Sequence, residues 1–258
     1  MSLVKPRSQK ELKLMRLSGQ ISAKALKKAL KSAKSGVSLL EIEDVAASEI
    51  KKNGAKLSFL SAPGYKWATC LTVNDELVHG IPRDIKLKDG DLLSIDVGAL
   101  FEGWHTDTAW SIIVGQEKDK EQLKEKTRFL KVGEKALWTG INQAVAGNTV
   151  GDISNAIQTV VEKAGYSISK TLIGHGVGKA LHEKPDIPGY GQRGVGLILE
   201  EGMTLAIEVI YAAKNADVYL SDDGWTYTTK DGSLGGLFEM SVIVGKDKAE
   251  VITDWRKV

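Results

Sequence analysis

Five side chains able to bind a metal ion stand out in the sequence: four carboxylates and one imidazole. They are Asp96, Asp107, His175, Glu208 and Glu239. The acids lie inside aliphatic and β-branched runs, in the strings LLSIDVG, WHTDTAW, TLAIEVI and GLFEMSV. A carboxylate buried in such a strand is costly unless it is paired or bound to a metal. An oxygen-rich set with a single imidazole suits two hard or borderline divalent ions better than one structural zinc.

The spacing of Asp96 and Asp107 predicts that the two acids share one face of a hairpin. Residues 92–101 and 104–114 are expected to be paired strands around a two-residue turn at Glu102-Gly103. In that register the residue opposite Asp107 lies two positions after Asp96, so both side chains point the same way. They become diagonal neighbours within reach of a shared ion. For this pair alone, a solvent-facing position on a half-exposed sheet explains the spacing equally well.

The second half of the chain repeats the pattern of the first. Residues 36–54 and 147–165 share a glycine, a hydroxyl cap, an acid three residues later and a closing glycine. The string DGDLLSID matches EGMTLAIE, which places Asp96 and Glu208 at equivalent positions. This repeat argues against the solvent-facing explanation. It predicts an α+β domain with two-fold pseudosymmetry, in which helices cover one face of a curved antiparallel sheet and the four acids meet on the other.

The remaining periodicity places the helices and the other strands. Helices are expected at 8–35, 39–53, 119–140 and 150–164. Further strands are expected near 57–60, 67–79, 167–173, 203–212, 216–220 and 237–244. The whole chain, residues 1–258, is expected to form a single domain with pseudosymmetric halves of about 36–115 and 147–245.

Composition narrows the class of protein. With 258 residues of which 42% are apolar, the chain can bury a large core, which argues against intrinsic disorder. No stretch approaches the ~20 apolar residues of a membrane span. The N-terminus lacks the apolar core of a signal peptide. Cys70 is the only cysteine, so an internal disulfide is excluded. These features favour a cytoplasmic protein, and nothing in the sequence indicates an obligate oligomer, so a monomer is expected.

Residues 1–35 carry ten lysines or arginines and a single acid, Glu11. One interpretation is a solvated lysine face on an amphipathic helix. A second is docking to an acidic partner, such as ribosomal RNA near the exit of nascent chains. Aromatic residues are not interleaved with the basic ones, so sequence-specific recognition of nucleic acid is not expected.

Five strings, in this order, resemble the motifs of type I methionine aminopeptidases. They are VNDELVHGIP, LLSIDVGALFEGWHTDTAWSIIVG, GHGVGKALHEKP, GMTLAIEVI and LGGLFEMSVIV, and the resemblance spans roughly residues 8–252. This family of short, bacterial-type metallopeptidases has the pita-bread (creatinase/aminopeptidase) fold. The resemblance implies removal of the initiator methionine from nascent proteins and peptides with a small second residue, by a metal-activated bridging water.

The resemblance also implies a role for each candidate metal ligand. Asp96 and Asp107 would bind from the first half of the chain, and His175, Glu208 and Glu239 from the second. Asp107 and Glu239 would each contact both of two divalent ions. Cobalt, manganese, iron and zinc all accept this ligand set, so the sequence leaves the metal open.

Three further roles come from the same resemblance. Glu208 would be the general base for the attacking water. His79 would contact the scissile amide, and His182 the carbonyl oxygen of the peptide. His105 has no such role; it is expected to be a satisfied or exposed histidine that shares the face of Asp107.

The resemblance assigns a pocket for the methionine side chain. Its expected lining comes from several segments: Phe59, Tyr65, Cys70, Leu181 and Trp225. Ala62 and Leu181 stand where aromatic residues are common in the family. The pocket is therefore expected to be wider or differently shaped, with Phe59 refilling part of the space.

Two other functions fit parts of the pattern. Prolidase and aminopeptidase P share the fold, but they usually carry a large extra N-terminal domain, for which this chain has no room. A non-catalytic relative that binds nucleic acid or a partner protein is the other alternative. Such relatives lose metal ligands, whereas all five candidate ligands are present here, together with His79 and His182.

Overall fold

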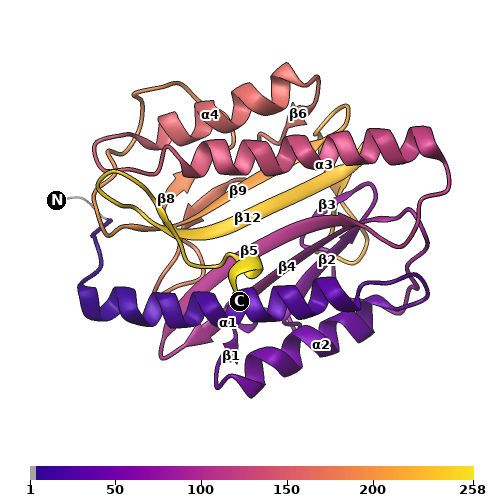
Figure 1. Cartoon of the computed structure of the whole chain (residues 1–258), viewed down its shortest axis with the longest axis horizontal. Coiled ribbons are helices and arrows are strands. Elements are labelled where there is room, and N and C mark those ends of the chain that lie inside the picture. The colour runs from indigo at the N-terminus through magenta and orange to yellow at the C-terminus, as the bar shows by residue number, and fades with distance from the viewer. Residues whose placement is uncertain (1–3) are drawn as a thin grey trace.

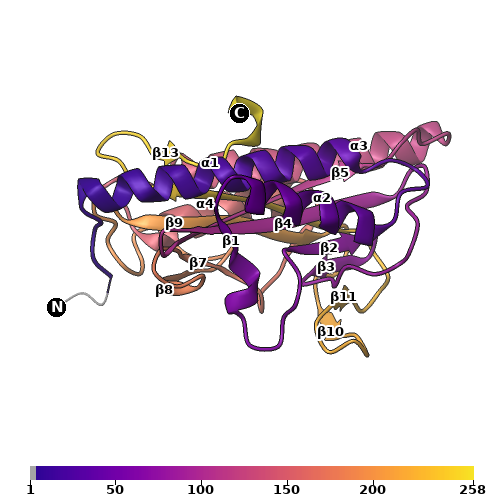
Figure 2. The ribbon, with the colours of Figure 1, turned by 90° about the horizontal axis from the view of Figure 1, so that it is seen from below.

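The computed structural model describes residues 4–258 and shows a curved antiparallel sheet with helices on its convex side (Figures 1 and 2). The α-helices are α1 (Gln9–Ser32), α2 (Leu39–Lys52), α3 (Lys120–Ile141) and α4 (Val150–Lys163). Helices α1 and α2 pack together over one half of the sheet, and α3 and α4 pack together over the other. In the part of the chain that the structure describes, no helix is both long enough and apolar enough to cross a bilayer.

Ten strands form the main sheet, with the central order β1-β4-β5-β12-β9-β7-β8. These strands are β1 (Lys56–Leu57), β4 (Leu92–Phe101), β5 (Trp104–Ile113), β12 (Gly235–Ile243), β9 (Thr204–Ala212), β7 (Gly174–Gly176) and β8 (Glu183–Ile187). Attached to them are β2 (Thr69–Val73), β6 (Ser167–Ile168) and β13 (Glu250–Val251). A small second sheet has the order β10-β11-β3, from β10 (Val218–Leu220), β11 (Tyr227–Thr229) and β3 (Glu76–Val78). It lies below the main sheet in Figure 2, on the side away from the helices.

Helix N-termini follow the side-chain pattern of the sequence. Ser38 and Glu41 form the capping box of α2, and Thr149 with Asp152 forms the equivalent box of α4. In each box the hydroxyl accepts from the third helical N–H and the acid accepts from the cap N–H, and loss of such a cap costs about 1 kcal/mol. The two repeated segments therefore start the same way in the structure.

Several boundaries differ from the sequence-based expectation. Helix α1 ends at Ser32 rather than 35, because the chain turns extended at Ala33 and Gly36 donates to Leu87 O. A short 3₁₀ helix, Ser58–Ser61, replaces most of the strand expected at 57–60.

Other differences concern the strands. The strand expected at 67–79 is divided into β2 and β3 by a turn at Asn74, whose φ is 59°. The prediction of a strand at 167–173 was wrong beyond Ile168, where β6 ends. The next pairing segments, β7 and β8, lie farther along, and β7 was missed because two of its three residues are glycines.

Two serines of α1 join this helix to the hairpin of β4 and β5. Ser18 Oγ lies 3.0 Å from both Ala99 O and Trp104 O. Ser22 Oγ accepts from the Ala99 N–H at 2.9 Å and lies 2.9 Å from Thr106 Oγ1. Both serines are fully buried. The helix is thus held against the hairpin by polar contacts with defined geometry as well as by apolar packing.

We predict that Ser22→Ala lowers the free energy of unfolding by about 1–3 kcal/mol, because the Ala99 N–H loses its buried acceptor. Chemical denaturation of the purified protein measures the loss. The matched control is Ser32→Ala at the end of the same helix, where the hydroxyl bonds only to Ala29 O within the helix. Equal stability of the two variants would contradict the role given to Ser22.

Candidate metal centre

The register of the sheet aligns three of the acids in one row. Asp96 of β4 pairs with Ala109 of β5, Ala109 pairs with Glu239 of β12, and Glu239 pairs with Glu208 of β9. Residues in such a row project from the same face, with their Cβ atoms about 4.5–5.5 Å apart across each pair of strands. Glu208 and Glu239 are therefore like charges directly opposite each other, an arrangement that destabilises a sheet unless the charges are neutralised.

The other two candidate ligands lie on the same face, one step along their strands. Asp107 is two residues from Ala109 and pairs with Gly98, as the hairpin register predicted. His175 pairs with Ala206, which is two residues from Glu208. Because side chains alternate along a strand, all five potential ligands share the face that is opposite the helices.

Side-chain hydroxyls fix the seam between β5 and β12. Ser241 Oγ accepts from the Asp107 N–H at 2.9 Å and donates to Asp107 O at 2.8 Å. Thr108 Oγ1 donates to Glu239 O at 3.0 Å. These bonds lie beside Asp107 and Glu239, which are diagonal neighbours across the seam because Glu239 pairs with Ala109. They hold the backbones of Asp107 and Glu239 at a set separation where strands from the two halves of the chain meet.

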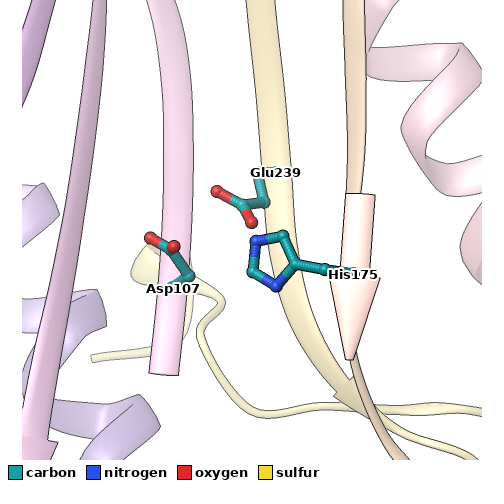
Figure 3. A group of neighbouring side chains, drawn as sticks. All are labelled: Asp107, His175 and Glu239. Atoms are coloured by element: carbon teal, nitrogen blue, oxygen red, sulfur yellow. The ribbon is translucent and has the colours of Figure 1, made fainter. Parts of the chain in front are cut away.

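Three of the five side chains converge closely. Potential ligand atoms of Asp107, His175 and Glu239 all lie within 4.8 Å of one another, and Figure 3 shows the imidazole ring facing both carboxylates. His175 Nδ1 lies 2.9 Å from Gly176 O, so this nitrogen carries the proton and donates it to the carbonyl. The tautomer leaves the lone pair of Nε2 free for a metal.

Asp107 and Glu239 are buried, Asp96 and Glu208 are half-buried, and the four acids lack enough donors to satisfy them. Burial raises the pKa of all four carboxyl groups, and that of Glu208 reaches about 8. The charge of Asp107 is the second cause for Asp96, Glu208 and Glu239. Asp96 Oδ1 and Glu239 Oε1 are buried and have no hydrogen-bond partner within residues 4–258. Such oxygens call for a cation or a proton.

Two histidines beside the acids are neutral at physiological pH. Burial, followed by the charge of His182, lowers the pKa of both His79 and His175 to about 4. The rings of His175 and His182 meet edge to face, with centroids 4.4 Å apart. His79 directly follows β3 and has a φ of 59°, which is uncommon for a residue with a side chain.

His105 is a satisfied buried histidine, as expected, although it shares the face of Asp107. Its Nδ1 lies 2.7 Å from Ser58 Oγ, and its backbone N–H donates to Gly178 O at 2.7 Å. Burial lowers the pKa of its ring. These contacts tie the 3₁₀ segment and the glycine-rich loop to β5.

A cavity of about 100 Å³ opens beside the acids. Its lining includes two of the acids, two histidines and the side chains expected to form the pocket: Asp96, Asp107, His79, His182, Phe59, Ala62, Tyr65, Cys70, Leu181 and Trp225. The rings of Tyr65 and Trp225 pack edge to face at 4.9 Å, and Phe59 meets Tyr65 at 6.3 Å. The structure thus brings the sequence-predicted pocket residues together and places them next to the carboxylates.

An ion pair near His182 could not be predicted from the sequence. The Arg7 guanidinium forms an ion pair with Glu183, and Arg7 Nε donates to Thr204 Oγ1 at 3.3 Å. Glu183 Oε1 also accepts from the Ala180 N–H at 2.9 Å. The N-terminal segment therefore braces the loop that carries His182. Arg7 and Glu183 are 176 residues apart, so no local pattern could have joined them.

Comparison with known proteins gives a consistent picture. A model of metallopeptidase family M24 matches residues 13–245. Methionine aminopeptidase 1 of Bacillus subtilis is 40% identical over 244 residues, which cover 95% of this chain and 96% of that protein. The crystal structure of methionine aminopeptidase from Thermotoga maritima has a TM-score of 0.93 at 36% identity and covers 97% of this chain and 99% of that one. The prolidase from Pyrococcus horikoshii, at a TM-score of 0.74 and 22% identity, covers 96% of this chain but 63% of its own, which shows the fold alone.

The raised carboxyl pKa values predict how stability depends on pH without metal. A group whose folded pKa lies above its unfolded value stabilises the fold at low pH, and that stability is lost as pH rises through the folded pKa. For Glu208 the window runs from 4.5 to about 8. In a chelating buffer the unfolding temperature should fall between about pH 6.5 and about pH 8, because below pH 6.5 the lowered pKa values of His79 and His175 oppose the effect of the carboxyl groups.

Glu208→Gln removes this titrating group and should flatten the fall in unfolding temperature. A saturating divalent ion should stabilise the unmodified protein more at pH 8 than at pH 5, because its ligands must be deprotonated. Thermal unfolding measured across pH, with and without metal, shows how the unfolding temperature depends on pH in each state. A pH-independent unfolding temperature of the metal-free protein would contradict the burial of these carboxylates.

Proposed function

Because the chain belongs to metallopeptidase family M24 and, within it, to the methionine aminopeptidases, we propose that it removes the N-terminal methionine from nascent proteins and peptides whose second residue is small. As a member of a metallopeptidase family, the enzyme uses a divalent metal. The observation that carries the proposal is the row of carboxylates beside a small, largely apolar cavity. A peptide end could meet a metal there while its first side chain fills the cavity.

The donor set fits two divalent ions. Asp96, Asp107, His175, Glu208 and Glu239 would hold them. Two of these residues present buried oxygens that lack a partner within residues 4–258, and His175 presents an unprotonated nitrogen. Four carboxylates balance the charge of two divalent ions. Asp107 and Glu239, diagonal neighbours across the seam, would hold the metal from the two halves of the chain. Cobalt, manganese, iron and zinc all suit this mixture of oxygen and nitrogen ligands.

When bound, divalent ions lower the pKa of a water and polarise a carbonyl. The chain supplies the remaining steps. Glu208 accepts the proton of the attacking water, which suits a carboxyl group whose pKa lies near neutrality in the metal-free site. His79 and His182 line the cavity. A neutral His79 can donate a hydrogen bond at the scissile amide, and His182 can donate to the oxygen on which negative charge develops.

The cavity supports selection of methionine at the first position. Phe59, Tyr65, Cys70, Leu181 and Trp225 form its apolar walls. A flexible, polarizable thioether packs well against aromatic rings and sulfur. The second residue would lie beside His79 and His182, where the histidines and carboxylates leave little space. A small second side chain is therefore part of the proposal.

The domain organisation of the chain remains a prediction. We propose that residues 1–258 form one domain with halves of about 36–115 and 147–245. The equivalent capping boxes of α2 and α4 support this, as does the shared row of Asp96 and Glu208.

Cytoplasmic location, a monomeric state and contact with the ribosome also stay predictions. The basic face of α1 supports the last of these by charge, although part of that face is engaged within the chain. Arg16 pairs with Glu250, and Lys28 pairs with Glu49.

Asp107→Asn tests the proposed bridge between the metal ions. Losing even an outer partner of a metal ligand costs about 10–100-fold in affinity or activity. Loss of a bridging charge should therefore lower methionine release from Met-Ala-Ser by at least ~10²-fold, with metal content reduced and the fold retained. Elemental analysis and circular dichroism accompany the assay, and Asp44→Asn, on the exposed face of α2, is the control. Full activity of Asp107→Asn after metal reconstitution would remove Asp107 from the site.

A peptide panel tests the substrate class. Met-Gly, Met-Ala and Met-Ser peptides should be cleaved well, whereas Met-Lys, Met-Leu and Met-Trp peptides should be poor substrates. Norleucine in first position should be tolerated. It replaces the sulfur of methionine with a methylene, and a change of one such group in an apolar pocket alters the binding free energy by only ~1–3 kcal/mol. X-Pro and Gly-Pro peptides should stay intact. Cleavage of those dipeptides would favour a prolidase, and release of leucine or phenylalanine as fast as methionine would remove methionine specificity.

A further inference from the structure

Glu43 is a buried carboxylate on α2 that belongs to no part of the metal centre. Its side chain is 8% exposed although it carries an acid. It accepts from the Ala68 N–H at 2.6 Å, from the Thr69 N–H at 2.9 Å and from Thr69 Oγ1 at 2.5 Å. All three donors are neutral groups within two adjacent residues. A carboxylate, with two oxygens that only accept, is suited to hold all three at once.

The segment that Glu43 holds supplies two walls of the cavity. Tyr65 Oη donates to Thr69 O at 2.7 Å, so the tyrosine ring is fixed through the residue that Glu43 anchors. Cys70, the next residue, also lines the cavity and pairs with Asp96 in the sheet. Thr69 thus links Glu43 to Tyr65 on one side and to Cys70 on the other.

The link extends to the neighbouring aromatic ring. Tyr65 packs edge to face on Trp225 at 4.9 Å. Trp225 lies on the segment between β10 and β11, far from α2 in the sequence. A shift of residues 68–69 would therefore move Tyr65 and loosen its contact with Trp225. Asp96 is held separately by the long pairing of β4 with β5.

We propose that Glu43 is a positioning residue for the first-side-chain pocket and that it sets how strictly the site selects methionine over branched or aromatic side chains. This inference rests on the proposed aminopeptidase function. Glu43 acts through residues 68–69 and touches no reacting atom. Glu43 does not line the cavity; it fixes the width of the cavity through its hydrogen bonds to Ala68 and Thr69.

The experiment compares Glu43→Gln with Glu49→Gln. Glu49 lies on the same helix, is 7% exposed, and accepts from Lys28 Nζ and Asn53 Nδ2, away from the pocket segment. For Glu43→Gln, the ratio of kcat/KM for Met-Ala-Ser to that for Leu-Ala-Ser should fall on the order of tenfold. The metal content should be unchanged, and kcat for Met-Ala-Ser should change far less than KM. For Glu49→Gln that ratio should stay at the value of the unmodified enzyme.

Hydrogen exchange of the Ala68 and Thr69 amides supplies a readout that does not depend on activity. Their exchange should speed up in Glu43→Gln and not in Glu49→Gln, because glutamine keeps only one accepting oxygen. If Glu43→Gln does not fold, Thr69→Val, which removes one donor, takes its place. Unchanged selectivity in the variant that folds, or the same change in Glu49→Gln, would overturn the proposal. An unmodified enzyme that releases no methionine would refute the proposed function, and the exchange data would still decide whether Glu43 holds the segment.

Discussion

The gathering of four carboxylates on one face of a sheet, two of them buried and two half-buried, is the constraint on which the rest of this structure depends. Glu208 and Glu239 pair directly on the neighbouring strands β9 and β12. Asp96 lies in the same row, separated from Glu239 by Ala109 of β5. Without a cation or a proton to neutralise the charges, such an arrangement is unfavourable, and the pKa values of these carboxyl groups are raised for that reason. Divalent ions are the natural compensation. A bound divalent ion would therefore stabilise the fold near neutral pH as well as supply the chemistry.

The surrounding structure keeps this cluster in register. A slip of one residue along any of the central strands would turn its acid to the helix-covered face. Ser241 and Thr108 fix the seam where Asp107 and Glu239 meet, and buried serines of α1 hold the hairpin of β4 and β5. Regular sheet geometry thus places the candidate metal ligands. Most apolar walls of the pocket, by contrast, come from loops and a 3₁₀ turn, with Cys70 of β2 as the exception. Selectivity can therefore vary with little effect on the candidate ligands.

The local patterns in the sequence predicted most of what regular geometry determines. Period-two alternation around Glu102-Gly103 gave the correct pairing of Gly98 with Asp107, and the repeated capping boxes marked α2 and α4. Features that depend on contacts between distant residues were beyond reach. The Gly174–Gly176 strand has little strand propensity and exists because it pairs with β8 and β9. The bonds of Arg7 to Glu183 and of Glu43 to Thr69 join segments whose proximity only the folded chain creates.

Anomalous scattering from a crystal grown with manganese tests the central claim most directly, because it locates ions without relying on activity. The account predicts two anomalous peaks on the face opposite the helices, both contacted by Asp107 and Glu239. Asp96, His175 and Glu208 should each contact at least one of the peaks. Oxygen atoms that lack a partner in the metal-free chain, Asp96 Oδ1 and Glu239 Oε1, should point at those peaks. Crystals with no peak among these carboxylates, at a manganese concentration that supports methionine release, would contradict it.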